Sequence, residues 1–461
     1  MLMPMPAPIK KVSSMNHKKL GSLFIVLGLS SLLIGLFFGT IGGVQYLLPP
    51  FLKDQLSFQK TRPLHVYLVI NWIFTAASGC MYYFFPTAAG RKLYSIKLGI
   101  IHFSLQLLVL LLIVSFFFAG KFSGREYLEF PPWVSLIILS SWILFMINFF
   151  KTIPLSFNHV PVYIWSWSTG LIFYFITMTE AHLWLLPYFN NNIVRDLTVQ
   201  WKALGSMVGS WNMLVYGTSM FVMESITGDK KINKSKTAFF FYFLGLTNLM
   251  FNWGHHTYIV PSSPIVKEVS FIISMTELLI LGKIIYSFRR SYIEAKLKYH
   301  HLPFRLLSFS DGWIFLNLIL AIIISVPAIN FYTHGTHITV AHAMGATIGI
   351  NTMLLLGSIF FILDELNEAL IERMKKYFGF AIVLLNISLL IFWAALIGSG
   401  IAKSIDMHQQ NFFAVTMEHL QPYFKVFIAS GAVVVMALFL ILVPLAKTFI
   451  NCISVKNKET V

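Results

Sequence analysis

The chain has 461 residues, of which 57% are hydrophobic and only 11% are charged, and its formal net charge is +16. Soluble globular domains contain a smaller share of hydrophobic residues and a larger share of charged ones, so this composition indicates an integral membrane protein. The basic residues are scattered through alternate loops instead of forming one patch, which argues against a nucleic-acid partner. Two cysteines, Cys80 and Cys452, are too few for a disulfide framework.

Long apolar segments recur along the whole chain. Crossing the hydrocarbon core of a bilayer takes about 20 such residues in a helix. The predicted spans, twelve in all, cover residues 20–48, 62–87, 92–118, 132–151, 161–187, 197–224, 236–259, 264–290, 312–332, 335–363, 375–401 and 421–449. The sequence therefore predicts an all-α polytopic membrane protein with one membrane domain, residues 1–461. In it a twelve-helix bundle at 20–449 lies between cytoplasmic tails at 1–19 and 450–461.

Basic residues gather in loops that alternate along this map, at residues 10–19, 91–97, 230–236, 289–305 and 373–376. Short loops rich in lysine and arginine stay in the cytoplasm. We therefore predict that both termini are cytoplasmic, which fits an even number of spans.

Histidines occupy three predicted spans at the end away from the cytoplasm. They are His65 in the second span, His255 and His256 in the seventh, and His334, His337 and His342 at or just inside the start of the tenth. Ionisable side chains are costly in a membrane and usually mark function, and histidine commonly binds haem iron and other metals. A shared depth on three helices predicts a buried haem or metal site. The alternative is that each histidine is an interfacial residue with ordinary partners.

The tenth span carries the pattern Val340-Ala-His-Ala-Met344. Residues two apart on a helix point about 200° apart, so His342 and Met344 face opposite sides and could ligate two different haems. Small residues follow at Gly345 and Gly349, which suits the close approach of a flat macrocycle or of another helix. The alternative role for the methionine is packing.

Four motifs together resemble the catalytic subunit, subunit I, of the haem-copper oxidase superfamily. They are Arg62-Pro-Leu-His65, Gly124-Arg-Glu-Tyr-Leu-Glu129, Gly254-His-His256, and His334-Gly-Thr-His followed by Val340-Ala-His342. Within the superfamily the motifs are most similar to the nitric oxide reductase large subunit and the cbb3-type oxidases. The resemblance implies residence in a prokaryotic inner membrane.

The resemblance also implies two haems. His65 and Met344 would ligate the low-spin haem, although the family has a second histidine where this chain has Met344, and His342 would ligate the high-spin haem. Imidazole and thioether together do ligate haem iron. His255 and His256 would bind a non-haem iron or copper ion.

Three acidic residues receive roles from the same resemblance. Glu126 and Glu129 match a loop that holds calcium in the reductases, with an exposed acidic pair as the alternative, and Glu277 matches a buried glutamate tied to proton supply.

The sixth span departs from the family pattern. Val199-Gln-Trp201 resembles the start of the family's helix, but Gly205 and Gly209 stand where the reductases have a third metal-binding histidine and a glutamate. His182, with Glu180, could supply the missing ligand. Otherwise His182 is an interfacial residue, and the second metal is weakly held or absent.

The function that the resemblance implies is a respiratory reductase of NO, supplied with electrons by a separate haem-bearing subunit. Terminal reduction of O2 is a second possibility, but neither Tyr216 nor Tyr258 has the spacing of the oxidases' crosslinked tyrosine. A third is a non-catalytic haem protein whose second metal site has decayed, and a transporter is a fourth.

Overall fold

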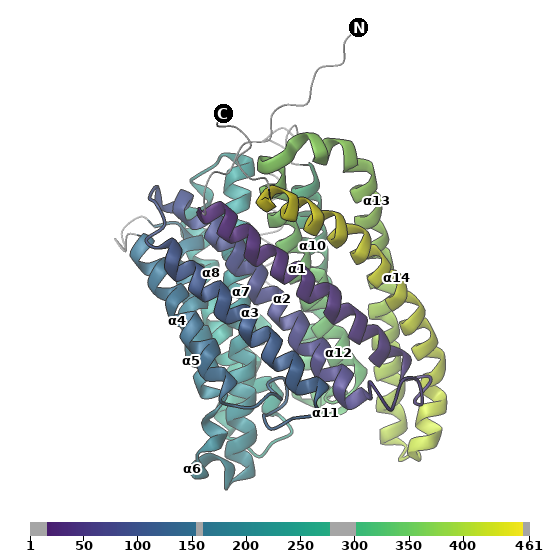
Figure 1. Cartoon of the computed structure of the whole chain (residues 1–461). Coiled ribbons are helices and arrows are strands. Elements are labelled where there is room, and N and C mark those ends of the chain that lie inside the picture. Colours follow the sequence, from purple (N-terminus) through teal and green to yellow (C-terminus); the bar gives the residue numbers. More distant parts are fainter. Residues whose placement is uncertain (1–15, 154–159, 277–300, 455–461) are drawn as a thin grey trace, which may run out of the picture.

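The computed structural model describes residues 16–153, 160–276 and 301–454, and these fold into helices joined by loops (Figure 1). The all-α class predicted from the sequence is confirmed. The apolar residues that suggested membrane spans fill the core between the helices, where aromatic side chains such as Trp72, Trp142 and Trp167 are fully buried.

The first four helices run up and down beside one another. They are α1 (His17–Val44), α2 (Phe58–Ala89), α3 (Ile96–Phe118) and α4 (Val134–Thr152). The most extensive contact between two described helices joins α1 to α2, and it runs from Gly21 beside Gly79 to Gly39 beside His65.

The next part of the chain packs mainly around one long helix. It comprises α5 (Val162–Glu180), η1 (Leu183–Leu185), α6 (Pro187–Asn190), α7 (Ile193–Thr227), η2 (Ile232–Lys234), α8 (Lys236–Phe251) and the 3-10 turn η3 (Asn252–Thr257). The chain is helical again over residues 264–276. The long helix α7 packs against α5 on one side and against α8 and η3 on another.

The last part is α10 (His301–Ser325), α11 (Pro327–Thr333), α12 (His337–Met344), the π-helix η4 (Gly345–Thr352), α13 (Met353–His408) and α14 (Phe413–Ser454). Helix α13 bends at Asn367, whose φ of −158° and ψ of 69° are not helical. The bend divides α12 to α13 into the two crossings that the sequence predicts as the tenth and eleventh spans.

Seven helices of the described ranges are long and apolar enough to cross a membrane, and one of them, the continuous run His337–His408, contains the bend. The predicted count of twelve is not reproduced by this measure. Both α5 and α7 are at least 19 residues long, but polar residues interrupt them. The predicted seventh span was also too long, because its α-helix ends at Phe251 and the histidines lie in η3.

The start of α1 and the end of α14 lie at the same end of the bundle (Figure 1). An even number of crossings has this property. The short helices α6 and α11 lie at the opposite end, together with the beginning of α12.

Candidate functional site

His65 lies two turns into α2, facing α1. Its Nδ1–H donates a hydrogen bond to the carbonyl oxygen of Gly35, at 2.8 Å. Gly39 makes room for the ring, because a Cβ at that position would come within 2.5 Å of Nδ1. A histidine held through Nδ1–H by a backbone carbonyl has a free lone pair on Nε2, which is how metal-binding histidines are usually oriented.

His342 and Met344 lie on α12 and have different surroundings. The Nδ1 of His342 is buried beside the backbone of Asn317 but has no hydrogen bond of good geometry among the described residues. His342 is close enough to interact electrostatically with His255 and His256. Met344 instead packs against an apolar cluster from α10, α12 and α13, made of Leu320, Ile324, Ile338, Ala341 and Leu396. The two side chains therefore serve different faces of α12.

The helix changes its hydrogen-bond register directly after Met344. In the π-helix η4, the side chain of Asn351 donates to the carbonyl oxygen of Ala346, and Thr352 donates to that of Thr347. Trp72 of α2, two turns from His65, donates its indole N–H to the Thr352 hydroxyl at 3.1 Å. Single π-turns often mark functional sites, and this one is tied to the helix that carries His65.

The adjacent histidines lie in η3. The Nδ1–H of His255 donates to Oδ1 of Asn252 at 3.1 Å, and the Ser274 hydroxyl donates to the same oxygen. Gly254 lets η3 approach the helical residues 264–276, since a Cβ there would come within 2.9 Å of Ser270. His255 is thus fixed through Nδ1 with Nε2 left free, as His65 is.

Trp201 of α7 stacks on His256. The ring centroids are 4.7 Å apart and the planes differ by 7°. The His255 and His256 rings are 4.3 Å apart, and His334 approaches His256 at 6.4 Å and Trp201 at 6.1 Å. Sequence reasoning considered Trp201 only as a motif residue, and no pattern in the sequence signals this stack.

Gly205 and Gly209 are packing positions. A Cβ at Gly205 would lie 2.6 Å from Cβ of Trp253, and one at Gly209 would lie 2.7 Å from Leu249. The Ser206 hydroxyl also donates to the carbonyl oxygen of Leu249, at 2.8 Å. The α8–η3 segment therefore packs so closely against α7 that larger side chains at these two positions would not fit without a shift.

His182 and Glu180 have other partners. The Nδ1–H of His182 donates to the Met178 carbonyl oxygen at 2.9 Å, so its Nε2 is the acceptor for the Ser135 hydroxyl at 2.8 Å. The carboxylate of Glu180 pairs with Lys202. Both ring nitrogens of His182 are occupied, which favours its interpretation as an interfacial residue.

Glu126 and Glu129 share one partner. Oε1 of Glu126 lies 2.5 Å from Nη2 of Arg62, and Oε1 of Glu129 lies 3.1 Å from Nη1 of the same guanidinium. The carboxylates therefore already contact a cation, and calcium at this place would have to compete with Arg62. Burial raises the pKa of Glu129 above its ordinary value in spite of Arg62.

Glu277 and His102 are the remaining ionisable residues that bear on the predicted site. Glu277 lies outside the described residues. His102, which the sequence argument did not include, is fully buried in α3, where its ring lies 4.9 Å from Phe145 and its Nδ1 lies 3.1 Å from the Tyr82 hydroxyl. His102 is near the start of α3, so membrane histidines are not confined to one end of the bundle.

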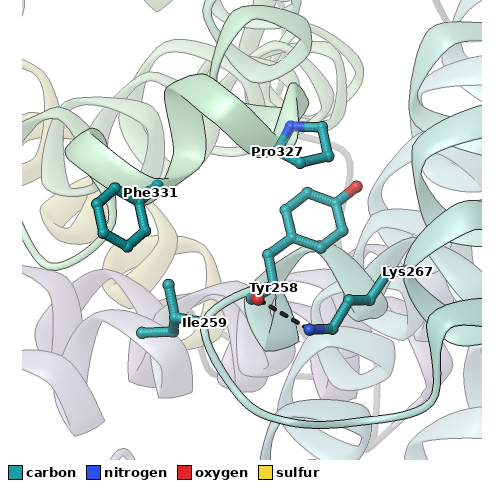
Figure 2. A pocket seen from close by; sticks show the side chains of 5 residues that line it. All are labelled: Tyr258, Ile259, Lys267, Pro327 and Phe331. Atoms are coloured by element: carbon teal, nitrogen blue, oxygen red, sulfur yellow. Dashed lines mark hydrogen bonds between the residues drawn. The ribbon is translucent and has the colours of Figure 1, made fainter.

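A small pocket adjoins η3. Figure 2 shows its lining, Tyr258, Ile259, Lys267, Pro327 and Phe331, with Nζ of Lys267 donating to the Tyr258 carbonyl oxygen at 2.9 Å. Its volume of about 110 Å³ suits a few water molecules of about 30 Å³ each, whereas a cofactor or drug-sized ligand takes about 300 Å³ or more.

These donors fit haem iron better than they fit a second metal. His65 has its Nδ1 satisfied and Nε2 free, and the half-buried His342 has a buried nitrogen without a good partner. For a non-haem ion, His255 and His256 are two imidazoles. In the three ranges that the structure describes, no group of three or more His, Cys, Asp or Glu is close enough to hold a metal ion.

Comparisons with known proteins bear on the family and the fold. The sequence model of the family "Cytochrome C and Quinol oxidase polypeptide I" matches residues 19–434. A nitric oxide reductase subunit of Stutzerimonas stutzeri is 24% identical over 394 residues, which are 79% of this chain and 80% of that protein. A heme-copper terminal oxidase dimer solved by cryo-EM superimposes with a TM-score of 0.71 at 11% identity, covering 96% of this chain and 85% of that one.

The structural likeness, at this low identity, shows the fold alone. The family match is broader, since it spans all but the ends of the chain and includes the histidine-bearing segments on α2, η3 and α12. The chain is a member of the cytochrome c and quinol oxidase polypeptide I family, within the haem-copper oxidase superfamily of membrane oxidoreductases.

Proposed function

We propose that this protein is the catalytic subunit of a respiratory membrane reductase that reduces NO. The observation that carries the proposal is the approach of His342 on α12 to His255 and His256 on η3, three imidazoles from segments that are 86 residues apart at their closest in sequence (342 − 256 = 86). NO reduction needs two metal centres close together, because two NO molecules must meet. The 24% identity to a nitric oxide reductase subunit favours the same assignment.

In this proposal His65 and Met344 hold the low-spin haem, and His342 holds the high-spin haem. Bound haem supplies one-electron chemistry. The chain's own contribution is to fix each imidazole: Gly35 accepts the Nδ1–H of His65, and Asn252 accepts that of His255. A ligand held in this way keeps its tautomer and its direction.

The proposal includes an electron-donor subunit that carries haem, and it places the chain in a prokaryotic inner membrane with both termini cytoplasmic. The loop with Glu126 and Glu129 is the proposed contact for that subunit, and Arg62 ties this loop to the start of α2. Glu277 is kept as the proposed proton-supplying group on the strength of the sequence alone.

A non-catalytic haem protein is the second candidate, and the packing at Gly205 and Gly209 favours it. A third metal-binding histidine does not fit at Gly205 without moving Trp253. O2 reduction is the third candidate. Among the described tyrosines, Tyr258 is the one beside η3 that could support it, and its ring lines the small pocket.

One experiment separates these candidates. The protein, purified from membranes, is assayed for haem, for total metal and for consumption of NO and of O2. The first proposal predicts two haems, one further metal ion and NO turnover. Two haems without turnover of either gas would support the non-catalytic protein, and O2 turnover alone would support an oxidase.

His342→Ala is the decisive variant. It should lose the high-spin haem and NO turnover while the low-spin haem remains. The matched control is His182→Ala, because both ring nitrogens of His182 are occupied within the protein. Retention of both haems in His342→Ala would refute the ligand assignment.

A further inference from the structure

One arginine of α2 holds the loop between α3 and α4, residues 123–129. The guanidinium of Arg62 lies 2.5 Å from Oε1 of Glu126 and 3.1 Å from Oε1 of Glu129. Its Cζ lies 5.9 Å from the centre of the Tyr127 ring, which is within the range of a cation–π contact. Three residues of the loop contact one side chain, so the loop is folded around a positive charge.

The backbone of this loop is shaped to keep those contacts. The N–H groups of Ser123 and Gly124 both donate to the Glu129 carbonyl oxygen, at 3.0 and 3.1 Å. Tyr127 has a φ of 69°, a left-handed conformation that residues other than glycine adopt only at a cost. This strained residue lies between Glu126 and Glu129, and it lets the chain turn so that both carboxylates reach the same guanidinium.

A second arginine ties the same loop to α7. Nη2 of Arg125 lies 2.5 Å from Oδ2 of Asp196, and the guanidinium lies 4.8 Å from the centre of the Trp184 ring. The side chains of Asp196 and Glu129 are only 9% and 16% exposed. Carboxylates so far removed from water need a charged partner, and on both sides of the loop that partner is an arginine.

The contacts of Glu126 and Glu129 do not fit a calcium ion. Calcium takes about six to eight oxygen ligands at about 2.3–2.6 Å. Here one oxygen of each carboxylate meets an Nη atom of Arg62, and the guanidinium charge would repel a divalent cation at the same place. Across residues 16–153, 160–276 and 301–454, no three His, Cys, Asp or Glu side chains gather closely enough to hold a metal ion.

We propose that the guanidinium of Arg62 does in this chain what calcium does in the corresponding loop of the reductases, so that loop 123–129 is fixed to α2 without a divalent ion. Arg62 is thereby a positioning residue. It stands about one turn before His65 on α2 and ties the loop to the helix that carries this histidine. This attachment is independent of which gas the protein reduces.

The response to calcium tests the proposal. The thermal unfolding midpoint and the bound calcium of the unmodified holoprotein in detergent are measured in EGTA and in about 10 mM Ca²⁺, with Mg²⁺ as the control for ionic strength. This concentration fills even weak calcium sites, whose Kd is about 0.1–1 mM. Calcium at the loop is defined as the amount that Glu126→Gln removes. The unmodified protein should hold none there, and its midpoint should be the same in all three solutions.

Arg62→Gln should gain a response to calcium. The carboxylates of Glu126 and Glu129 are then left together without a cation, so this variant should bind about one calcium per chain. Its midpoint should rise by about 1 °C or more when calcium is added, and adding Glu126→Gln should abolish the effect. Arg62→Lys keeps a cation and should not respond. Arg125→Gln is the matched control, because it makes the same change of charge in the same loop but frees only one carboxylate, that of Asp196.

Three results would overturn the proposal. They are calcium at the loop in the unmodified protein, a folded Arg62→Gln variant that does not respond to calcium, and a response of equal size in Arg125→Gln. The haem spectrum of each variant reports that it has folded. If Arg62→Gln does not fold, the unmodified protein and Arg62→Lys decide: a lack of response in both supports the proposal, and calcium at the loop overturns it. None of these measurements uses NO turnover, so the proposed function can fail while this proposal stands.

Discussion

Gly205→Ala should damage the proposed metal site at His255 and His256 far more than it damages the fold. A Cβ at position 205 would lie 2.6 Å from Cβ of Trp253, whereas ordinary contacts begin at 3.4 Å, so the two backbones must separate by about 0.8 Å (3.4 − 2.6). Such overpacking costs about 1–3 kcal/mol. Replacing glycine by alanine within a helix returns about 1 kcal/mol, which leaves a net loss of about 0–2 kcal/mol.

The same 0.8 Å is large for a metal ligand. Metal–ligand distances are held to about 0.2 Å, and Trp253 is two residues from His255. We therefore expect the thermal unfolding midpoint of Gly205→Ala in detergent to fall by a few degrees at most. Its affinity for Zn²⁺, used as a probe ion for the proposed metal site at His255 and His256, should fall at least about tenfold.

Gly245→Ala is the matched control in the same pair of helices. Its added Cβ would meet one atom, Cε of Met213 at 3.0 Å, at the end of a flexible side chain. This variant should keep both stability and zinc affinity. Equal loss of zinc in the two variants, or unchanged zinc affinity in Gly205→Ala, would refute the reasoning that packing at Gly205 sets the position of the histidine pair.

Three other predictions concern the remaining candidate residues. Met344→His should lower the reduction potential of the low-spin haem, because methionine raises it relative to a second histidine; an unchanged potential in a redox titration would remove Met344 from the ligand set. Gly39→Ala should displace the His65 ring, since the new Cβ would come within 2.5 Å of Nδ1, and the optical spectrum should then lose the low-spin haem and keep the high-spin one. Burial raises the pKa of Glu129 above its ordinary value of 4.5 in spite of Arg62, so its contribution to stability is present below that value and is lost as the pH rises through the raised pKa of the folded state. Glu129→Gln should flatten this part of the pH dependence of the thermal midpoint, and an unaltered profile would contradict the assignment.

The sequence was sufficient to place His65 and His342 on their helices. Apolar segments of about 20 residues predict the crossings, and His65 and His342 fall where those crossings predict them, on α2 and α12. The opposed directions of His342 and Met344 follow from helix geometry alone, and their different neighbours in the structure agree with it.

Features that depend on the path of the backbone were beyond the sequence argument. The amino-acid types of Gly345–Thr352 do not distinguish a π-helix from an α-helix, because the two differ in which carbonyl oxygen accepts each backbone N–H. The pairing of Arg62 with Glu126 joins residues 64 positions apart through an irregular loop. The stack of Trp201 on His256 likewise depends on how η3 meets α7.

Gly205 and Gly209 show why a missing ligand cannot be interpreted from a motif alone. In the sequence they indicate only that two metal-binding side chains are gone. In the structure their absence of side chains brings Trp253 and Leu249 against α7, and this approach goes with the stack of His256 on Trp201 and with the position of His334 one ring away. A histidine restored at Gly205 would have to displace Trp253, so it would disturb the pair it was meant to complete. The glycines at 205 and 209 and the stack of His256 on Trp201 thus belong to one packing arrangement between α7 and the α8–η3 segment.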